Sequence, residues 1–254
     1  MATGLGGEQL WLSPTVANNV NPYDDQSGQG NNGTNNGTTV VSDTSSGGTY
    51  CFDFDGVNDY VSTLFGPSSW VTTGVFSLSA WVKYDTVQDS GIVGGGVGTA
   101  DAGISNVYDT FASNRGHGTV YSKGIIGSYA ARSYANDLAS VTAGQWYHVL
   151  STGDGTDVQI YINGVLLGTS AIAGFSSVGW SSNLEVGCVK TGTSRIWFLD
   201  GRTDDIRAYD RTLTQSEITH LATSRGVLGP PGGATHYNPF KTHAFTNNFQ
   251  QRLR

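Results

Sequence analysis

The chain of 254 residues contains 36 glycines, and only 13% of its residues are charged. Glycine is therefore about twice as frequent as the usual ~7%, and charged residues are about half as frequent as the usual ~25%. This composition argues against coiled coils and helical bundles, which need Glu, Lys, Leu and Ala. Aromatic and β-branched residues recur throughout, so we expect one folded domain with tails.

The net charge of −7 is unevenly distributed. Residues 211–254 hold five basic residues and one acidic residue, a net charge of +4, while the other residues hold eight basic and 19 acidic residues, a net charge of −11. An acidic body repels nucleic acid, so no nucleic-acid partner is expected. No stretch approaches 18 apolar residues, and the first residues lack a basic and an apolar leader region. We therefore expect neither membrane insertion nor a secretory signal.

Residues 24–49 are almost entirely Gly, Asn, Thr and Ser, which predicts a loop with one short strand at 39–41. Residues 75–83 alternate between apolar and polar side chains, with Trp81 as the exception, which predicts a half-buried strand. The apolar positions are Phe76, Leu78, Ala80 and Val82, and the polar positions are Ser77, Ser79 and Lys83. Further strands are predicted at 50–54, 58–63, 146–152, 183–188, 194–199 and 203–209. Residues 90–140 predict short strands and long loops.

Two local signals are sharper. Asn163-Gly164 separates two β-branched runs, which predicts a two-residue hairpin with a type I′ turn. Thr214 and Glu217 have the spacing of a capping box, followed by apolar residues at helical spacing, with Gly226 as the expected C′ residue. This pattern predicts one short helix, which we expect to cover one end of the fold.

Residues 229–233 read as a linker, and a basic, aromatic-bearing tail follows it. A frayed terminus is one interpretation of this tail. Because interfaces are enriched in aromatic residues and Arg, a docking arm is the favoured alternative. Its candidate contact residues are Tyr237, Phe240, Phe245, Phe249, Arg252 and Arg254. Cys51 and Cys188 are two buried free thiols or, if adjacent strands bring them together, a disulfide.

Several blocks of the sequence resemble the laminin-G-like, concanavalin A-like jelly rolls. The blocks are residues 25–34, 52–61, 76–83, 145–149, 160–165, 201–213 and 217–218. The resemblance covers roughly residues 9–228. It implies an all-β, two-sheet antiparallel β-sandwich with one short C-terminal helix and an extended tail. The implied division is an N-terminal arm at 1–8, the jelly roll at 9–228, and a linker with docking tail at 229–254.

The same superfamily includes glycoside hydrolases, which need two carboxylates about 5–10 Å apart. Members that resemble endoglucanases carry a Glu-x-Asp-x-x-Glu pattern, whereas the only glutamates here are Glu8, Glu185 and Glu217. A pair among the 17 aspartates is left open. The chain has no nucleophile elbow, and a lone His148 in a strand is typical of packing. The five histidines lack zinc spacing. We expect no enzymatic activity.

Calcium is the metal that the resemblance supports, since family members often hold one between the early and closing strands. The matching positions are Asp55 or Asp59 and Asp204 or Asp205. Solvated turn aspartates, or a salt bridge to Arg207, are the alternatives.

Sugar binding needs an aromatic platform with polar neighbours. Trp180 lies in a polar segment and is the candidate for stacking on a glycan. Trp81 and Trp146 lie in strand motifs and are expected in the core, and Trp70 and Trp197 are left open.

These observations favour a non-enzymatic structural or binding protein displayed on a surface. The first hypothesis is a virion protein, such as a phage capsid decoration or appendage, made in the cytoplasm. It would be anchored through its tail to a capsid or other large assembly, and would form a homo-oligomer. The alternative is a calcium-assisted module that binds host or environmental glycan, on a bacterial surface or secreted outside the cell.

Overall fold

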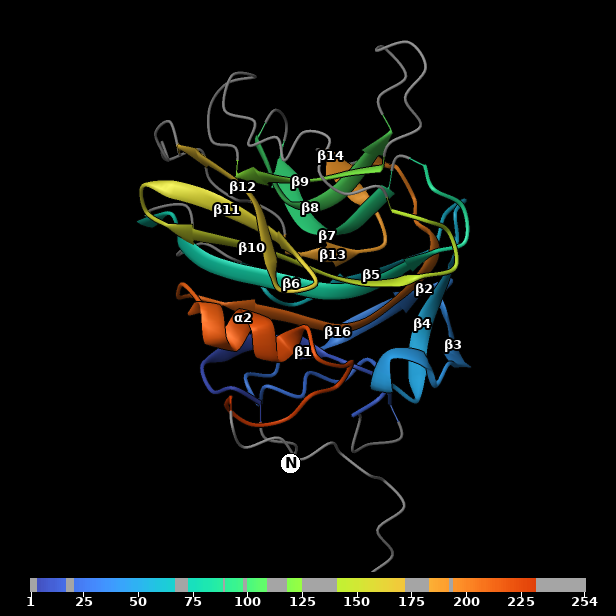
Figure 1. Cartoon of the computed structure of the whole chain (residues 1–254). Coiled ribbons are helices and arrows are strands. Elements are labelled where there is room, and N and C mark those ends of the chain that lie inside the picture. The colour runs from blue at the N-terminus through green and yellow to red at the C-terminus, as the bar shows by residue number, and fades with distance from the viewer. Residues whose placement is uncertain are drawn as a thin grey trace, which may run out of the picture.

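The computed structural model describes residues 4–16, 21–66, 73–88, 90–97, 100–108, 118–124, 141–171, 183–191 and 194–231. Two antiparallel sheets lie face to face, and one short helix covers the outside of the larger sheet (Figure 1). The predicted all-β sandwich is confirmed. Within the described parts of the chain, no helix is long and apolar enough to cross a membrane.

The large sheet has eight strands in the order β12-β11-β10-β6-β16-β4-β3, with β1 paired to β16. Its strands are β1 (Glu8–Leu12), β3 (Thr39–Ser42), β4 (Tyr50–Asp55), β6 (Val75–Tyr84), β10 (Trp146–Asp154), β11 (Asp157–Ile162), β12 (Val165–Ala171) and β16 (Asp200–Tyr209). The closing strand β16 therefore pairs with strands from the beginning and the middle of the chain.

The small sheet has the order β2-β5-β13-β7-β8-β9, and a separate hairpin joins β14 to β15. These strands are β2 (Gly33–Asn36), β5 (Tyr60–Thr63), β7 (Ser90–Val97), β8 (Ala100–Tyr108), β9 (Gly118–Gly124), β13 (Glu185–Val186), β14 (Val189–Thr191) and β15 (Ser194–Ile196). Two expectations were wrong. The segment 24–49 contains a second strand, β2, and the 3-10 turn η1 (Ser45–Gly47), and β7 to β9 are seven to nine residues long rather than short.

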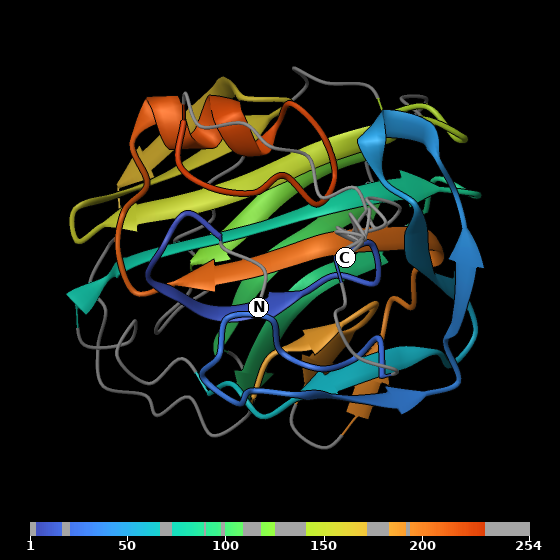
Figure 2. The same cartoon turned by 90° about the horizontal axis from the view of Figure 1, so that it is seen from below.

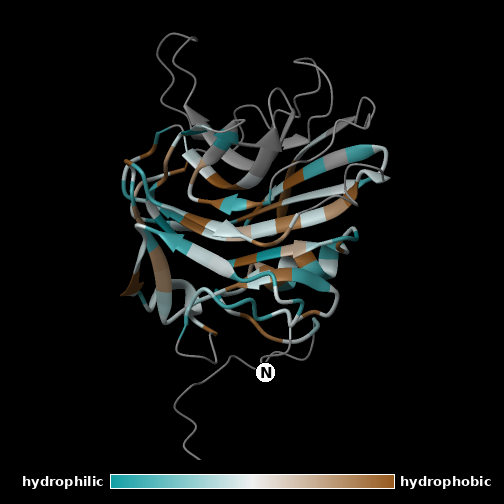
Figure 3. Cartoon of the chain, turned by 180° about the vertical axis from the view of Figure 1, so that it is seen from behind, coloured by the Kyte–Doolittle hydropathy of each residue, from teal (hydrophilic) through white to brown (hydrophobic). Residues whose placement is uncertain are grey.

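The main core lies between the two sheets and is apolar. Its buried members include Leu10, Phe52, Phe54, Leu78, Val82, Val149, Ile160, Val186 and Ile206. Figure 3, in which hydrophobic residues are brown, shows brown and paler or teal segments alternating along the strands. The alternation places one face of each strand in this core.

The prediction of a half-buried strand at 75–83 was wrong. Ser77 and Ser79 on the other face of β6 are fully buried, and Trp81 follows the same alternation as they do. A second layer of chain covers this outer face and forms a smaller apolar cluster of Leu150, Tyr161, Tyr209, Leu213, Ile218, Leu221 and Val227. Both faces of the central strands of the large sheet are therefore enclosed.

The predicted helix is α2 (Gln215–Leu221), and its capping box between Thr214 and Glu217 is present. The helix ends at Leu221 with Ala222 as its C-cap, so Gly226 is not its C′ residue, although Gly226 has a positive φ of 68°. The helix covers the outer face of the large sheet rather than an end of the sandwich (Figure 2). Trp81 donates from Nε1 to the carbonyl oxygen of Leu221 at 3.2 Å, which ties the helix to β6.

The predicted hairpin joins β11 to β12, with positive φ at Asn163 (51°) and Gly164 (79°). A side chain at Gly164 would come within 3.3 Å of the Cα of Thr219 on the helix, so glycine serves both the turn and the packing. Cys51 and Cys188 are free buried thiols, and burial raises the pKa of Cys51 to about 12.

Candidate functional site

Four side chains from four neighbouring strands form a row on the outer face of the large sheet. Strand pairing places Asp53 opposite Arg202, Arg202 opposite Lys83, and Lys83 opposite Trp146. Opposed residues in antiparallel strands project to the same face, about 4.5–5.5 Å apart. The side chains of Asp53 and Arg202 are 32% and 28% exposed. We call these four residues the polar row.

Asp43, from the loop after β3, holds the polar row from one side. Its Oδ2 accepts hydrogen bonds from Lys83 Nζ at 2.8 Å, from Trp146 Nε1 at 3.3 Å and from Arg202 Nη1 at 3.5 Å. Burial acts to raise the pKa of Asp43, but the hydrogen bonds from Lys83 and Ser45 outweigh it and hold that pKa well below its usual range. Arg202 Nε also donates to Asp53 Oδ1 at 2.8 Å. The row is thus a fixed array of charges beside one half-buried indole.

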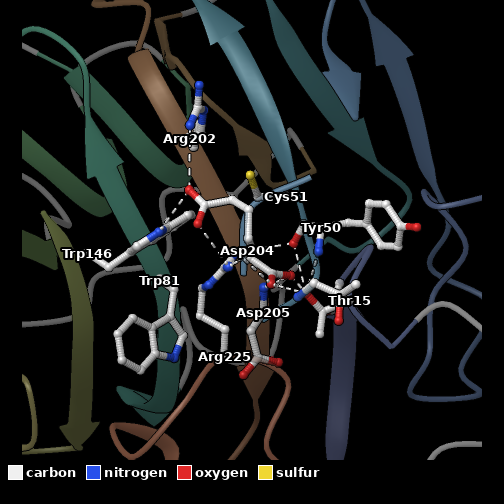
Figure 4. A network of polar contacts seen from close by, with 12 residues as sticks. Thr15, Tyr50, Cys51, Trp81, Trp146, Arg202, Asp204, Asp205 and Arg225 are labelled. Atoms are coloured by element: carbon white, nitrogen blue, oxygen red, sulfur yellow. Dashed lines mark hydrogen bonds and ion pairs between the residues drawn. The ribbon is translucent and has the colours of Figure 1, made fainter. Parts of the chain in front are cut away.

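A buried arginine from the segment after the helix packs against the row. The guanidinium of Arg225 lies 4.1 Å from the centroid of the Trp146 ring, and Lys83 Nζ lies 5.8 Å from it (Figure 4). Arg225 also donates to the carbonyl oxygens of Asp43, Ser45 and Tyr50. Because this side chain is fully buried, it fixes the loop at 43–50 and the indole in one position.

Asp204 joins the two ends of the domain. Its Oδ2 accepts from Thr15 Oγ1 at 2.6 Å and from Arg225 Nη1 at 3.3 Å, and its Oδ1 accepts from Ser13 Oγ at 2.7 Å (Figure 4). Burial raises the pKa of Asp204 to about 6, against the opposing pull of Arg225. Thr15 has one hydroxyl proton but faces two acceptors, since Tyr50 O lies at 2.8 Å. A protonated Asp204 would donate to Thr15 and satisfy both contacts.

Asp205 pairs with Arg207 instead. Arg207 Nε donates to Asp205 Oδ1 at 2.8 Å, and Trp11 Nε1 donates to the same oxygen at 2.6 Å. The Arg207 guanidinium lies 4.2 Å from the centroid of the Trp11 ring. We call Asp204, Asp205, Arg207 and Arg225 the buried ion cluster. It explains why the N-terminal strand and the segment after the helix stay against the sheet.

The structure separates the two halves of the predicted calcium site. Asp55 is opposite Asp200 in the pairing of β4 with β16, so Asp204 lies four residues further along the strand, about 13 Å away. Asp55 Oδ1 accepts from the backbone N–H groups of Val57 and Asn58, and Asp59 Oδ2 accepts from Asp55 N.

Asp55 and Asp205 therefore fit the alternative interpretations, a turn aspartate and a salt bridge to Arg207, better than they fit a calcium site. Asp55 is an exposed turn aspartate, and Asp205 makes the salt bridge to Arg207. No group of three or more His, Cys, Asp or Glu side chains suited to a metal ion occurs among residues that the structure describes. The four aspartates thus do not fit one calcium ion, and calcium binding stays a prediction.

The other predicted sites have mixed outcomes. Trp180 and the tail residues Tyr237, Phe240, Phe245, Phe249, Arg252 and Arg254 lie outside the described residues, as does Trp70. Trp81 is buried as expected, but Trp146 is only half buried and belongs to the polar row. Sequence reasoning missed this row. One signal could have found it. Trp146 directly precedes Tyr147, which faces the core, and because successive strand residues face opposite sides, the indole of Trp146 faces outward.

Each of the three glutamates already has partners. Glu8 accepts from the backbone N–H groups of Leu5 and Gly6, Glu185 forms a bidentate pair with Arg195, and Glu217 caps the helix and pairs with Arg211. His148 is buried, and burial lowers its pKa to about 3, with the charge of Arg207 acting in the same direction. It is therefore neutral in the folded protein at ordinary pH.

Comparison with known families decides the identity of the fold. The profile of the concanavalin A-like lectin/glucanases superfamily (Laminin_G_3) matches residues 54–219. The chain belongs to this family. That match spans β4 to α2 and includes every residue of the polar row except Asp53.

Solved structures of the lectin/glucanase fold agree with this assignment. Domain 4 of AbnA, a GH43 extracellular arabinanase from Geobacillus stearothermophilus solved with arabinotriose, is 21% identical with a TM-score of 0.61, and the match covers 87% of this chain and 100% of that one. Trypanosoma rangeli sialidase, in a mutant displaying trans-sialidase activity, is 19% identical with a TM-score of 0.60, over 88% of this chain and 34% of that one. The binding domain of Paraclostridial Mosquitocidal Protein 1 is 16% identical with a TM-score of 0.57, over 85% and 52%.

A search of the curated proteins returns no match for this sequence. The chain spans about a third of the sialidase and about half of the mosquitocidal binding domain that it matches. Enzymes and binding domains share this fold, so the fold alone does not choose between hydrolysis and binding.

Proposed function

We propose that this chain is a carbohydrate-binding module displayed on a surface, and that the polar row holds the glycan. The observation that carries the proposal is the placement of Trp146 beside Lys83, Arg202 and Asp53 on a half-exposed sheet surface. Sugar sites combine an aromatic surface with a few fixed polar groups that set orientation. The row supplies both from strands, which hold side chains more rigidly than loops do.

The charged members suit hydroxyl-rich ligands. A carboxylate accepts hydrogen bonds from sugar hydroxyls, while Arg and Lys donate to them, and such charge-assisted bonds are the stronger kind. Because Asp43 already orders Lys83 and Arg202, little side-chain freedom would be lost on binding. The complete coverage of domain 4 of AbnA, solved with arabinotriose, supports a module of this size as a sugar-binding unit.

Binding without hydrolysis is part of the proposal. A glycosidase needs one carboxylate free to protonate the leaving group and another to act as base or nucleophile. All three glutamates are engaged in structural contacts, and Asp204 and Asp205 are buried in ion pairs. These contacts support a binding role.

The test is a glycan array probed with the full chain, followed by calorimetry on the best ligand. Arg202→Gln and Asp53→Asn should each weaken binding at least tenfold, since each removes a charged contact, while the folding transition stays in place. Val57→Ser is the matched control because Val57 is 69% exposed and lies outside the row. Equal affinity of all three variants would reject the polar row as the binding surface.

Two further binding measurements test the predictions made for Trp180 and for calcium. Loss of binding in Trp180→Ala alone would move the site to Trp180. Loss of binding on chelation, restored by calcium, would establish the calcium-assisted form, and binding unchanged by chelation would reject it.

We propose that the module is displayed on a virion and that its C-terminal tail anchors it there. His220 Nε2 lies 3.0 Å from the carbonyl oxygen of Gly229, so a truncation after residue 231 leaves this contact intact. Deletion of residues 232–254 should abolish association with a large particle while the domain still folds. A particle that retains the truncated protein would contradict the anchor role.

A further inference from the structure

The two cations of the polar row are each paired with a carboxylate. Lys83 Nζ lies 2.8 Å from Asp43 Oδ2, and Arg202 Nε lies 2.8 Å from Asp53 Oδ1. Arg202 Nη1 also faces Asp43, with 3.5 Å between Nη1 and Oδ2. The positive charges of Lys83 and Arg202 are therefore balanced by the negative charges of Asp43 and Asp53.

The charged groups next to the row add no positive excess. Arg225, which packs against the row, lies 3.3 Å from the carboxylate of Asp204. Because the pKa of Asp204 is about 6, this pair is ionised in most molecules at pH 7. The hydrogen bond to Asp53 raises the pKa of Arg202, and the charge of Asp85 acts in the same direction, so a further carboxylate lies near the row. The surroundings of Arg202 are thus neutral or slightly negative.

Arg202 does not present the free pair of N–H groups that an acidic ligand would use. Carboxylates and sulfates accept hydrogen bonds and donate none, and a carboxylate binds a guanidinium best through two parallel N–H groups. In Arg202, Nε already donates to Asp53 and Nη1 donates to Asp43. Both forks of the guanidinium, Nε with Nη2 and Nη1 with Nη2, therefore include a nitrogen that faces a carboxylate. An incoming anion would have to displace that carboxylate or lie against it.

We propose that Asp53 makes the polar row selective for uncharged glycans over acidic ones. This inference rests on the proposed glycan-binding function and adds the class of ligand. A sugar hydroxyl can both donate and accept, so neighbouring hydroxyls can donate to Asp53 and accept from Arg202 at the same time. A uronate carboxylate or a sulfate can only accept, and the side chain of Asp53, which is 32% exposed, repels it at the same surface.

The test is an array of matched pairs, in which each neutral hexose oligosaccharide is printed beside the uronate obtained by oxidising its C6 hydroxyl. We expect the wild type to bind the neutral member at least about tenfold more tightly. Its affinity should change less than about twofold between about 0.05 and 0.5 M NaCl, because salt screens interactions between charges and a neutral ligand carries none. Equal or tighter binding of the uronates would overturn the selectivity and leave the proposed function in place. If no member of any pair binds, the proposed function fails and the selectivity fails with it.

The Asp53→Asn substitution tests the role of this one carboxylate. It makes the row more positive by one charge and leaves Arg202 with an uncharged partner, so the ratio of uronate to neutral affinity should rise at least about tenfold. Asp154→Asn is the matched control. It removes the same charge, keeps an acceptor for two backbone N–H groups, and lies opposite Val75, about 27 Å along β6 from Lys83. An unchanged ratio in Asp53→Asn, or an equal rise in the control, would refute the role of Asp53. If Asp53→Asn does not fold, the wild-type ratio decides.

Discussion

The two faces of the large sheet are built by different means. The inner face packs apolar side chains such as Phe52 and Leu78 against the small sheet. The outer face buries the ionised groups of Arg207 and Arg225, paired with aspartates, beneath a second layer of chain. Apolar packing therefore holds the inner face, whereas on the outer face buried paired charges add to a smaller apolar cluster.

This difference has a consequence for stability. Apolar packing responds to lost volume and hardly to pH, whereas a buried ion pair is costly to break from one side because the partner charge is stranded. The outer face also ties together segments far apart in the chain, since Asp204 contacts both Thr15 and Arg225. We expect substitutions on the two faces to differ in kind.

The largest effect is expected for Arg225→Met. This change leaves Asp204 buried without its cation and removes the guanidinium hydrogen bonds to the carbonyl oxygens of Ser45 and Tyr50. The free energy of unfolding, measured with urea at pH 7, should fall by about 3–5 kcal/mol. Arg202→Met is the control, because its half-exposed pair with Asp53 is expected to contribute at most about 1 kcal/mol. Equal losses in the two variants would contradict the role given to the buried ion cluster.

An apolar truncation on the inner face provides the contrast. Leu78→Ala should lower the free energy of unfolding by about 2–5 kcal/mol through the cavity that it leaves. The loss should be the same at pH 7 and at pH 5, because the described core cluster around Leu78 contains no Asp, Glu or His side chain. A loss that changes with pH would show that the two faces are coupled.

The Asp204→Asn substitution tests the outer face through the pH dependence of the free energy of unfolding. The pKa of Asp204 is about 6 in the folded protein and 3.8 ordinarily, so the folded protein binds this proton more tightly. Its contribution to stability is fully present below about pH 4 and is lost as the pH rises through 6. Relative to Asp204→Asn, the wild type should gain about 2 kcal/mol between pH 7 and pH 4. A constant difference between the two proteins would contradict the raised pKa.

His148→Gln should show the opposite sign. The pKa of His148 is about 3 when folded and 6.5 ordinarily, so its contribution is present above pH 6.5 and is lost as the pH falls. Relative to the variant, the wild type should lose about 2 kcal/mol between pH 7 and pH 5. Urea titrations of both proteins at the two pH values measure this difference, and a gain by the wild type would refute a neutral buried His148.

The smallest effect is expected at the helix terminus. Thr214→Ala removes the side chain that caps Glu217 N, and the cost should be about 1 kcal/mol. Thermal unfolding at pH 7 measures it. A loss as large as that of Arg225→Met would mean that the helix, rather than the ion cluster, holds the outer layer.

The sequence could predict the inner face, and it could predict elements whose signals are local. Alternation placed Phe76 and Leu78 in the core, Asn163-Gly164 predicted the hairpin, and Thr214 with Glu217 predicted the helix start. Each of these signals lies within a few residues of the chain.

The outer face depends on contacts that no local pattern encodes. Ser77 and Ser79 look like solvent-facing residues until the helix and the C-terminal segment cover them. The polar row exists only because strands from four parts of the chain pair in one register. A β-bulge after Asp204, with Asp205 at a φ of 52°, breaks the alternation that would have shown which aspartate faces which partner.

The central claim is that the polar row binds a glycan, and chemical-shift mapping tests it most directly. Uniformly labelled full-length protein is titrated with the oligosaccharide that binds best on the array. The account predicts saturable shifts at the Trp146 indole N–H, the Lys83 amide and the Arg202 Nε–H, with residues of the inner core unmoved. Saturable binding that shifts other residues and leaves these three signals in place would contradict it.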